Sequence, residues 1–195
     1  MFSHADAYDR FVGRYSTLLA PQMADLGRVA RGQRVLDVGC GPGALTRELV
    51  ARVGADAVCA VDPSEPFVAA VRARCAGVDA RVASAESLPY SDDAFDVTLA
   101  QLVVHFMKDP VAGIREMARV TRPGGVVVAC VWDHVEAGPL TAFWTAVREL
   151  DPDAVDESDL PGVRKGHLAQ LFAAAGLGEI EDSAIYARLP VDAFE

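Results

Sequence analysis

Three glycines at alternate positions, Gly39, Gly41 and Gly43, form the pattern most indicative of chemistry in this 195-residue sequence. They follow the apolar run of residues 34–38 and precede a helical pattern that begins at Ala44. Glycine permits a tight turn and leaves bare backbone for a ligand, and the amides of a helix N-terminus attract carboxylate or phosphate. The pattern therefore predicts a site for a nucleotide-containing ligand at the carboxyl end of a strand.

Two aspartates accompany this turn. Asp37 lies within the apolar run, where a carboxylate must accept hydrogen bonds, either from loop amides or from a ligand ammonium group. Asp62, followed by Pro63, ends the next apolar run, and its carboxylate can hold both hydroxyls of a ribose if the two strands are neighbours. The alternative is that Asp62 caps the helix that begins near Pro66, although Ser64 is better placed to do so.

Short apolar runs alternate with helical patterns, which is typical of a parallel α/β sheet. The runs are continuous rather than alternating, so helices are expected on both faces of the sheet. Residues 1–31 are amphipathic and helical in pattern, with an interruption at Pro21. Strands are expected at residues 34–38, 57–61, 80–84, 95–100, 126–132 and 179–189, and further helices at residues 44–53, 66–76, 111–120, 139–150 and 165–175.

Composition excludes several classes of protein. The hydrophobic content of 51% in 195 residues predicts one domain with one core, and the net charge of -10 argues against binding of nucleic acid. The four cysteines form no pair with the spacing of a zinc or disulfide framework, and the acidic residues 151–159 lack the pattern of a calcium loop, so we expect no metal. The longest apolar run, Val126 to Trp132, is far shorter than the ~20 residues of a membrane span. A cytoplasmic protein is therefore expected.

Four segments together resemble the class I S-adenosylmethionine (SAM)-dependent methyltransferases. They are Val-Leu-Asp-Val-Gly-Cys-Gly-Pro-Gly at residues 35–43, the acidic strand end at Asp62, residues 83–97, and Thr-Arg-Pro-Gly-Gly at residues 121–125. The resemblance covers residues 34–132 and is closest to the small-molecule branch that includes the ubiquinone and menaquinone biosynthesis methyltransferases. It implies a Rossmann-like, mostly parallel sheet, SAM as cofactor, and methyl transfer to an O, N or C nucleophile of a small molecule.

The resemblance also implies roles for individual residues. It places the adenine edge at Ala85 and Glu86, and it puts Ser84 where many relatives have an aspartate that accepts from the adenine amino group. Gln101, at the end of the fourth strand, would contact the methionine portion of SAM or simply cap the strand. Asp37 and the residues given by the resemblance make up the predicted cofactor site: Tyr8, Arg14, Asp37, Gly39, Gly41, Gly43, Asp62, Pro63, Ser84, Ala85, Glu86 and Gln101.

The segment at residues 8–16 resembles the leading helix of related methyltransferases, which closes over the cofactor. Tyr8 or Arg14 would then touch SAM, Arg14 by pairing with its carboxylate, unless the helix serves only for packing. Methyl transfer from a sulfonium needs alignment and exclusion of water more than it needs a catalytic group. A general base helps a phenol, enol or carbon acid, and His105 or His134 would serve, with rim packing as the alternative for each.

The family sheet usually has seven strands, and this sequence predicts six. The fold expected is therefore a single domain at residues 1–195 without the usual seventh strand, with a helical lid (1–31), a SAM-binding core (32–132) and a substrate side (133–195). An open sheet edge needs another partner, which points to a truncated form, a homodimer or a rearranged edge. Two other functions remain open: a SAM-binding protein without catalysis, and an NAD-dependent oxidoreductase, because the glycines also fit a looser dinucleotide pattern.

Overall fold

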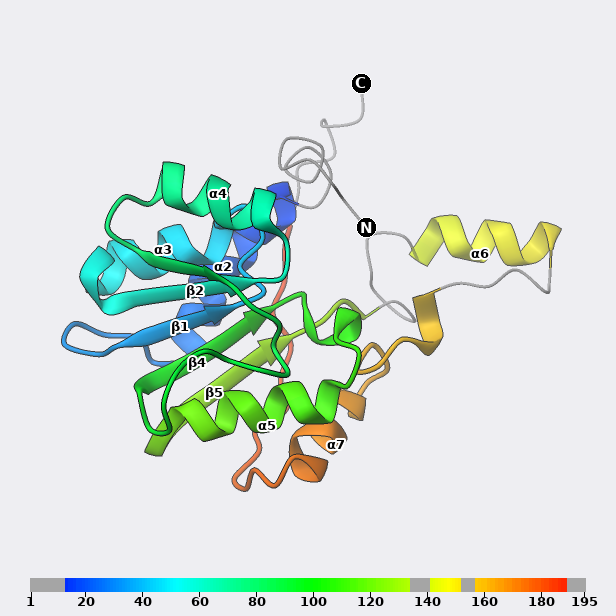
Figure 1. The fold of residues 1–195 in the computed structure, drawn as a ribbon. Coiled ribbons are helices and arrows are strands. Elements are labelled where there is room, and N and C mark those ends of the chain that lie inside the picture. Colours follow the sequence, from blue (N-terminus) through cyan, green and yellow to red (C-terminus); the bar gives the residue numbers. More distant parts are fainter. Residues whose placement is uncertain (1–12, 134–140, 152–156, 189–195) are drawn as a thin grey trace.

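Five parallel strands form one sheet in the computed structural model, which describes residues 13–133, 141–151 and 157–188. The order of the strands is β3-β2-β1-β4-β5 (Figure 1). β1 pairs with β2 on one side and with β4 on the other, so the turn after β1 lies where the direction of winding reverses. The strands are β1 (Val35–Val38), β2 (Val58–Asp62), β3 (Asp79–Val82), β4 (Phe95–Gln101) and β5 (Thr121–Cys130).

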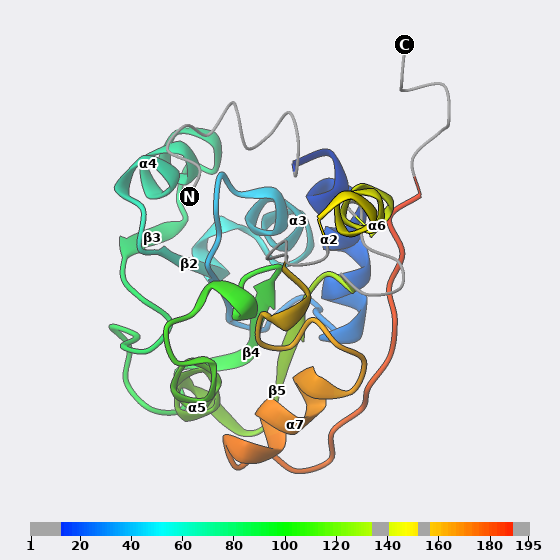
Figure 2. The same cartoon turned by 90° about the vertical axis from the view of Figure 1, so that its right-hand side faces the viewer.

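Helices cover both faces of this sheet, as the continuous apolar runs predict. Side chains alternate along each strand, so that Val35 packs into the cluster that contains α2 and α3, and Leu36 into the cluster that contains α5 and α7. Figures 1 and 2 show α2, α3 and α4 on one face and α5 and α7 on the other. None of the helices in the described ranges is long and apolar enough to cross a membrane. The helices are α2 (Arg14–Leu26), α3 (Ala44–Val53), α4 (Glu65–Arg74), α5 (Pro110–Val120), α6 (Thr141–Leu150) and α7 (His167–Ala174), with short 3-10 helices η2 (Ala55–Ala57), η3 (Val104–Phe106) and η4 (Glu157–Asp159).

Pro21 does not interrupt the first described helix, contrary to the sequence prediction. α2 continues through it to Leu26. Proline removes the donor to the carbonyl group four residues earlier, and here that residue, Thr17, is exposed, so water can satisfy the carbonyl. The carbonyl of Pro21 itself accepts a hydrogen bond from Arg52 of α3 at 3.0 Å, which ties the two helices together.

Residues 121–125, at the start of β5, have an architectural role. Phe95 pairs with Thr121 while Val97 pairs with Val126, so the residues between Thr121 and Val126 loop out of the ladder. A Cβ atom on Gly125 would lie 2.6 Å from the carbonyl oxygen of Asp96, which requires glycine at this close approach.

The predicted sixth strand is wrong. Residues 179–188 contain no strand, although the chain there is held against the body of the protein. The side chain of Gln22 on α2 donates to the carbonyl oxygen of Tyr186 at 2.9 Å and accepts from its amide at 3.1 Å. Ile185 and Ala187 pack against the cluster between α2 and the sheet. This C-terminal segment therefore finds its backbone partner in a helix side chain rather than in a strand, and Figure 2 shows it running past α2.

Candidate functional site

The turn after β1 is built from glycines in the left-handed region. The φ angles are +69° at Gly39, +51° at Gly41 and +96° at Gly43, which side chains with a Cβ atom rarely adopt. The amides of Gly39 and Cys40 both donate to the carbonyl oxygen of Val61, at 2.8 and 2.9 Å. These bonds fix the turn against the carboxyl end of β2.

Gly39 and Gly41 are required for different reasons. A Cβ atom on Gly39 would lie 2.5 Å from Cγ1 of Val103, so this glycine lets the chain after β4 pack against the turn. A Cβ atom on Gly41 would meet nothing within 4 Å. The backbone at Gly41 therefore faces open space, where a ligand can lie directly against it.

Asp37 is a carboxylate buried beneath this turn. Only 1% of its surface is exposed, and its Oδ2 accepts a hydrogen bond from Oγ1 of Thr46, in the first turn of α3, at 2.6 Å. Burial raises the pKa of Asp37 to about 7, against the lowering effect of Thr46, and the nearby Asp62 adds to the rise. Asp37 therefore has a strong preference for a cationic or hydrogen-bonding partner.

Asp62 holds the second strand end to the glycine turn. Its Oδ2 accepts from the amide of Gly41 at 2.9 Å, and its Oδ1 accepts from the amide of Ser64 at 2.8 Å. Each oxygen keeps a further lone pair, so the carboxylate can also accept from two hydroxyl groups. Burial raises the pKa of Asp62 in spite of these two amides. Neither the side chain of Asp62 nor that of Ser64 caps α4, so the alternative role of helix capping is wrong for both residues. Pro63, between them, is exposed.

Gln101 brings the end of β4 to the same place. Its Nε2 donates to the carbonyl oxygen of Ser16 in α2 at 3.1 Å, while its Oε1 is buried and has no hydrogen-bond partner among the described residues. A buried amide oxygen without a partner is costly, and a ligand donor relieves this cost. Gln101 lines one small pocket together with Ser16, Asp37, Gly39, Cys40, Gly41, Pro42, Ala44 and Leu45.

The segment predicted to cover adenine lies next to Asp62, through a bond from the amide of Ala83 to the carbonyl oxygen of Asp62 at 3.2 Å. Ser84 is exposed and Ala85 is buried. The Glu86 side chain is engaged elsewhere: its Oε1 accepts from backbone amides of the loop that leads into α5.

Of the remaining predicted residues, the structure describes His105 and Arg14. His105 lies in η3 just after β4 and is 5% exposed. The centroid of its ring lies 4.0 Å from that of Phe106, so His105 is packed as the alternative interpretation expects. Arg14 begins α2 and lies over the ring of Tyr15. Tyr8 and His134 fall outside the described residues.

Sequence reasoning missed three residues that shape the site. The hydroxyl of Thr46 donates to Asp37, and the carbonyl oxygen of Ser16 accepts from the side chain of Gln101. Leu102 turns the chain sharply after β4 with a φ of +60°. Only Thr46 carries a sequence signal, because it falls in the first turn of the helix that follows the glycines. The other two depend on how distant segments pack.

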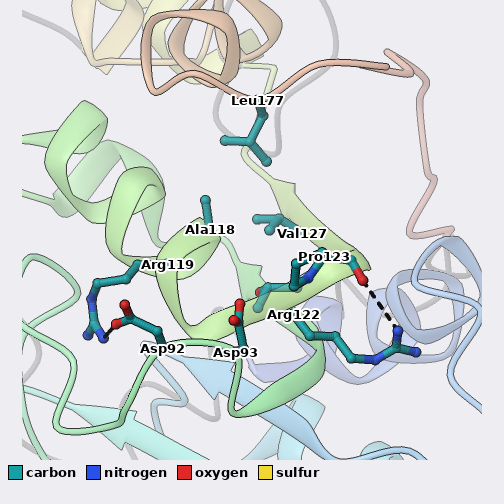
Figure 3. Close-up of a pocket in the computed structure, with 10 residues that line it drawn as sticks. Asp92, Asp93, Ala118, Arg119, Arg122, Pro123, Val127 and Leu177 are labelled. Carbon is teal, nitrogen blue, oxygen red and sulfur yellow. Dashed lines mark hydrogen bonds and ion pairs between the residues drawn. The ribbon is translucent and has the colours of Figure 1, made fainter.

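A separate hollow lies at the opposite end of the sheet, around the turn from α5 into β5 (Figure 3). Arg119 there bonds Asp92 and Glu116, and Arg122 bonds Asp96, so both guanidinium groups already have carboxylate partners. This hollow is distant from the glycine turn and is accounted for by these structural ion pairs.

Comparison with known proteins agrees with this geometry. A family model described as a methyltransferase domain matches residues 36–129, the part of the chain that contains the glycine turn, Asp62 and Gln101. Residues 36–129 are a methyltransferase domain. SAM is the cofactor of such a domain, as the sequence resemblance predicts.

Relatives of this methyltransferase domain are named for different reactions. The chain is 40% identical over 162 residues to the ubiquinone biosynthesis O-methyltransferase of Rhizobium etli, covering 80% of this chain and 63% of that protein. It is 30% identical over 163 residues to the malonyl-[acyl-carrier protein] O-methyltransferase of Serratia marcescens, covering 80% and 62%. The chain thus spans less than two thirds of the length of these relatives.

The fold is also similar to that of methyltransferases of known structure. A structure of the Haloferax volcanii Trm112 methyltransferase activator with its methyltransferase matches 96% of this chain and 82% of that one, with a TM-score of 0.73 and 22% identity. The methyltransferase domain of this chain therefore has the Rossmann-like fold of its class, in agreement with the sequence prediction.

The residues at the turn suit SAM. Open space at Gly41 admits a ligand against bare backbone. Oε1 of Gln101, which bonds none of the described residues, and the carboxylate of Asp37 offer acceptors for an ammonium group. The two oxygens of Asp62 retain lone pairs suited to the ribose hydroxyls.

Proposed function

We propose that this protein transfers the methyl group of SAM to an oxygen, nitrogen or carbon nucleophile of a small molecule. The observation that carries the proposal is the open backbone at Gly41, bordered by Asp37, Asp62 and the Gln101 oxygen, which has no hydrogen-bond partner in the described part of the chain. Three buried polar side chains converge there from three neighbouring strands. Protein groups satisfy only part of the hydrogen-bonding capacity of these side chains, and the remaining acceptors are available to a ligand.

The roles we propose follow the polarity of each group. Asp37 and Oε1 of Gln101 accept from the ammonium group, Gly39, Gly41 and Gly43 border the methionine end, and Asp62 accepts from the ribose. The turn at Ser84 and Ala85 covers the adenine, with Pro63 exposed beside the ribose position. Tyr8 and Arg14 close the site from the N-terminal side in this proposal.

SAM supplies a methyl group already activated on a sulfonium, which a nucleophile displaces in line. The protein therefore aligns the two reactants and excludes water, and proton removal is its only further task. His105 is the described candidate for a base because it lies immediately beyond β4, with His134 as the second. The relatives named as a ubiquinone biosynthesis O-methyltransferase and a malonyl-[acyl-carrier protein] O-methyltransferase support an oxygen nucleophile in the acceptor.

Incubation with methyl-labelled SAM and a panel of phenols, carboxylic acids and amines tests this function. Label in an acceptor supports it. Tight binding of SAM without transfer to any member of the panel favours the alternative of a SAM-binding protein without catalysis, and binding of NADH in preference to SAM favours the oxidoreductase.

We also propose that residues 1–195 act as one domain in the cytoplasm without nucleic acid, and that the outer edge of β5 pairs with a second copy. β5 has β4 as its partner on one side, and no strand of the described residues pairs with its other side. An open edge of this length favours association with another strand.

A further inference from the structure

Two segments, one after β3 and one after β4, meet at the carboxylate of Glu86. Its Oε1 accepts from the amide of Lys108 at 2.8 Å and from the amide of Asp109 at 3.4 Å. Burial alone would raise the pKa of Glu86, but the backbone amides and the Ser84 hydroxyl outweigh it and hold the pKa below its ordinary value. The side chain is therefore an ionised acceptor, which makes the stronger class of hydrogen bond.

The first of these segments belongs to the cofactor side. The amide of Ala83 donates to the backbone of Asp62. Two residues later, Ala85 is buried against α5, and a Cβ atom added to Gly113 of α5 would lie 3.4 Å from the Cβ atom of Ala85. Glu86 follows directly. A ligand that presses on residues 84 and 85 therefore acts on the base of the Glu86 side chain.

The second segment follows β4, and we call it the acceptor-side loop because it contains His105, the base of the proposed function. It starts at the left-handed Leu102, continues through η3 with His105 and the largely exposed Phe106, and ends at Asp109. Asp109 caps α5 by accepting from the amide of Ala112 at 3.0 Å. This acceptor-side loop, residues 102–109, is thus fixed at its far end both by α5 and by Glu86.

We propose that Glu86 is a positioning residue that couples the SAM site to the acceptor-side loop, so that cofactor binding further stabilises the bonded arrangement of the loop. The coupling rests on the proposed function, because it needs a ligand under residues 84 and 85. It assigns Glu86 an indirect part in the site: the carboxylate acts on the loop rather than on adenine. Coupling of this kind is reciprocal, so an ordered loop also favours the cofactor.

Hydrogen–deuterium exchange of residues 102–109, with and without S-adenosylhomocysteine, tests the coupling. In the natural protein, the ligand should slow exchange of the Lys108 and Asp109 amides. Glu86→Ala should reduce this ligand-dependent protection about ten-fold, the equivalent of one charged hydrogen bond. Glu86→Gln should restore part of it, because an amide oxygen can accept from the same two N–H groups but makes weaker, uncharged bonds. Glu86→Asp should not, because its carboxylate is one methylene shorter.

Glu116→Ala is the matched control. Glu116 anchors the same segment to α5 by accepting from the amide of Leu88 at 3.0 Å, yet it has no bond to the acceptor-side loop among the contacts of the described residues. It should lose stability without losing the ligand-dependent protection of residues 102–109. Equal loss of protection in Glu116→Ala and Glu86→Ala would overturn the proposal, as would full protection in Glu86→Ala. Absence of S-adenosylhomocysteine binding by the natural protein would instead overturn the proposed function, and the coupling with it.

Discussion

Asp37 carries the sharpest prediction at the scale of single residues. Its pKa of about 7 belongs to the protein without ligand, and pairing with the ammonium group of the cofactor needs the ionised form. Affinity should therefore increase as pH rises from 5.5 to 7.5, by up to about ten-fold per unit below the pKa. The upper limit of this pH range lies below the pKa of an α-amino group, about 7.7 to 8.0, so the ammonium group of the ligand stays protonated throughout.

Calorimetric titration with S-adenosylhomocysteine across this window measures the effect. Asp37→Asn should bind more weakly and should lose most of the pH dependence, because its amide does not ionise. Equal affinity at both ends of the window in the natural protein would contradict the pairing.

Gly39 and Gly41 predict opposite outcomes for the same substitution. Gly39→Ala should lower the free energy of unfolding by about 2 kcal/mol or more, because its Cβ atom overlaps Val103 and its φ is positive. Gly41→Ala should cost only about 1 kcal/mol of backbone strain, because its Cβ atom points into open space, but it should abolish cofactor binding. Denaturant unfolding and calorimetry separate the two effects. A Gly41→Ala variant that binds normally would show that the cofactor lies elsewhere.

The roles of some polar residues of the site can be predicted from a local sequence pattern, and those of others cannot. Asp37, Asp62 and the glycines stand at strand ends, so a local pattern places them correctly. The link from Gln101 to Ser16 joins residues 85 positions apart and depends on where α2 packs. No local pattern contains that information. The same holds for Glu86, whose partners are amides of a distant loop.

At the scale of elements, Gln22 is the residue that holds the C-terminal segment. Gln22→Ala removes both bonds to Tyr186 and should cost about 1 kcal/mol of stability, with faster exchange of the Tyr186 amide. Gln170→Ala, an exposed glutamine on α7, should leave both quantities unchanged. Unaltered exchange at Tyr186 in Gln22→Ala would mean that Ile185 and Ala187 hold the segment by packing alone.

The strands and helices that the sequence predicted correctly are those whose apolar pattern agrees with their tertiary surroundings. The three central strands, β2, β1 and β4, are mostly apolar and buried, and each pairs with a neighbour on both sides. The predicted sixth strand differs, because the side chain of Gln22 takes up the amide and the carbonyl oxygen of Tyr186, and residues 179–188 stay irregular. Pro21 was misjudged because an exposed carbonyl at Thr17 makes the lost hydrogen bond tolerable.

At the scale of the whole molecule, the open edge of β5 predicts self-association. Sedimentation velocity should show a species of twice the 20.7 kDa mass of the chain at micromolar concentration. A single species of 20.7 kDa at every concentration would contradict the proposed homodimer and leave the site unaffected.

The central claim is that the turn after β1 binds SAM, with Asp62 holding the ribose. Calorimetric titration of the natural protein and of Asp62→Ala with S-adenosylhomocysteine tests it most directly. We predict one site per chain in the natural protein and a loss of about 1 to 3 kcal/mol in the variant, about 5-fold to 150-fold in affinity. Absence of binding by the natural protein, or equal affinity in the two proteins, would contradict the claim.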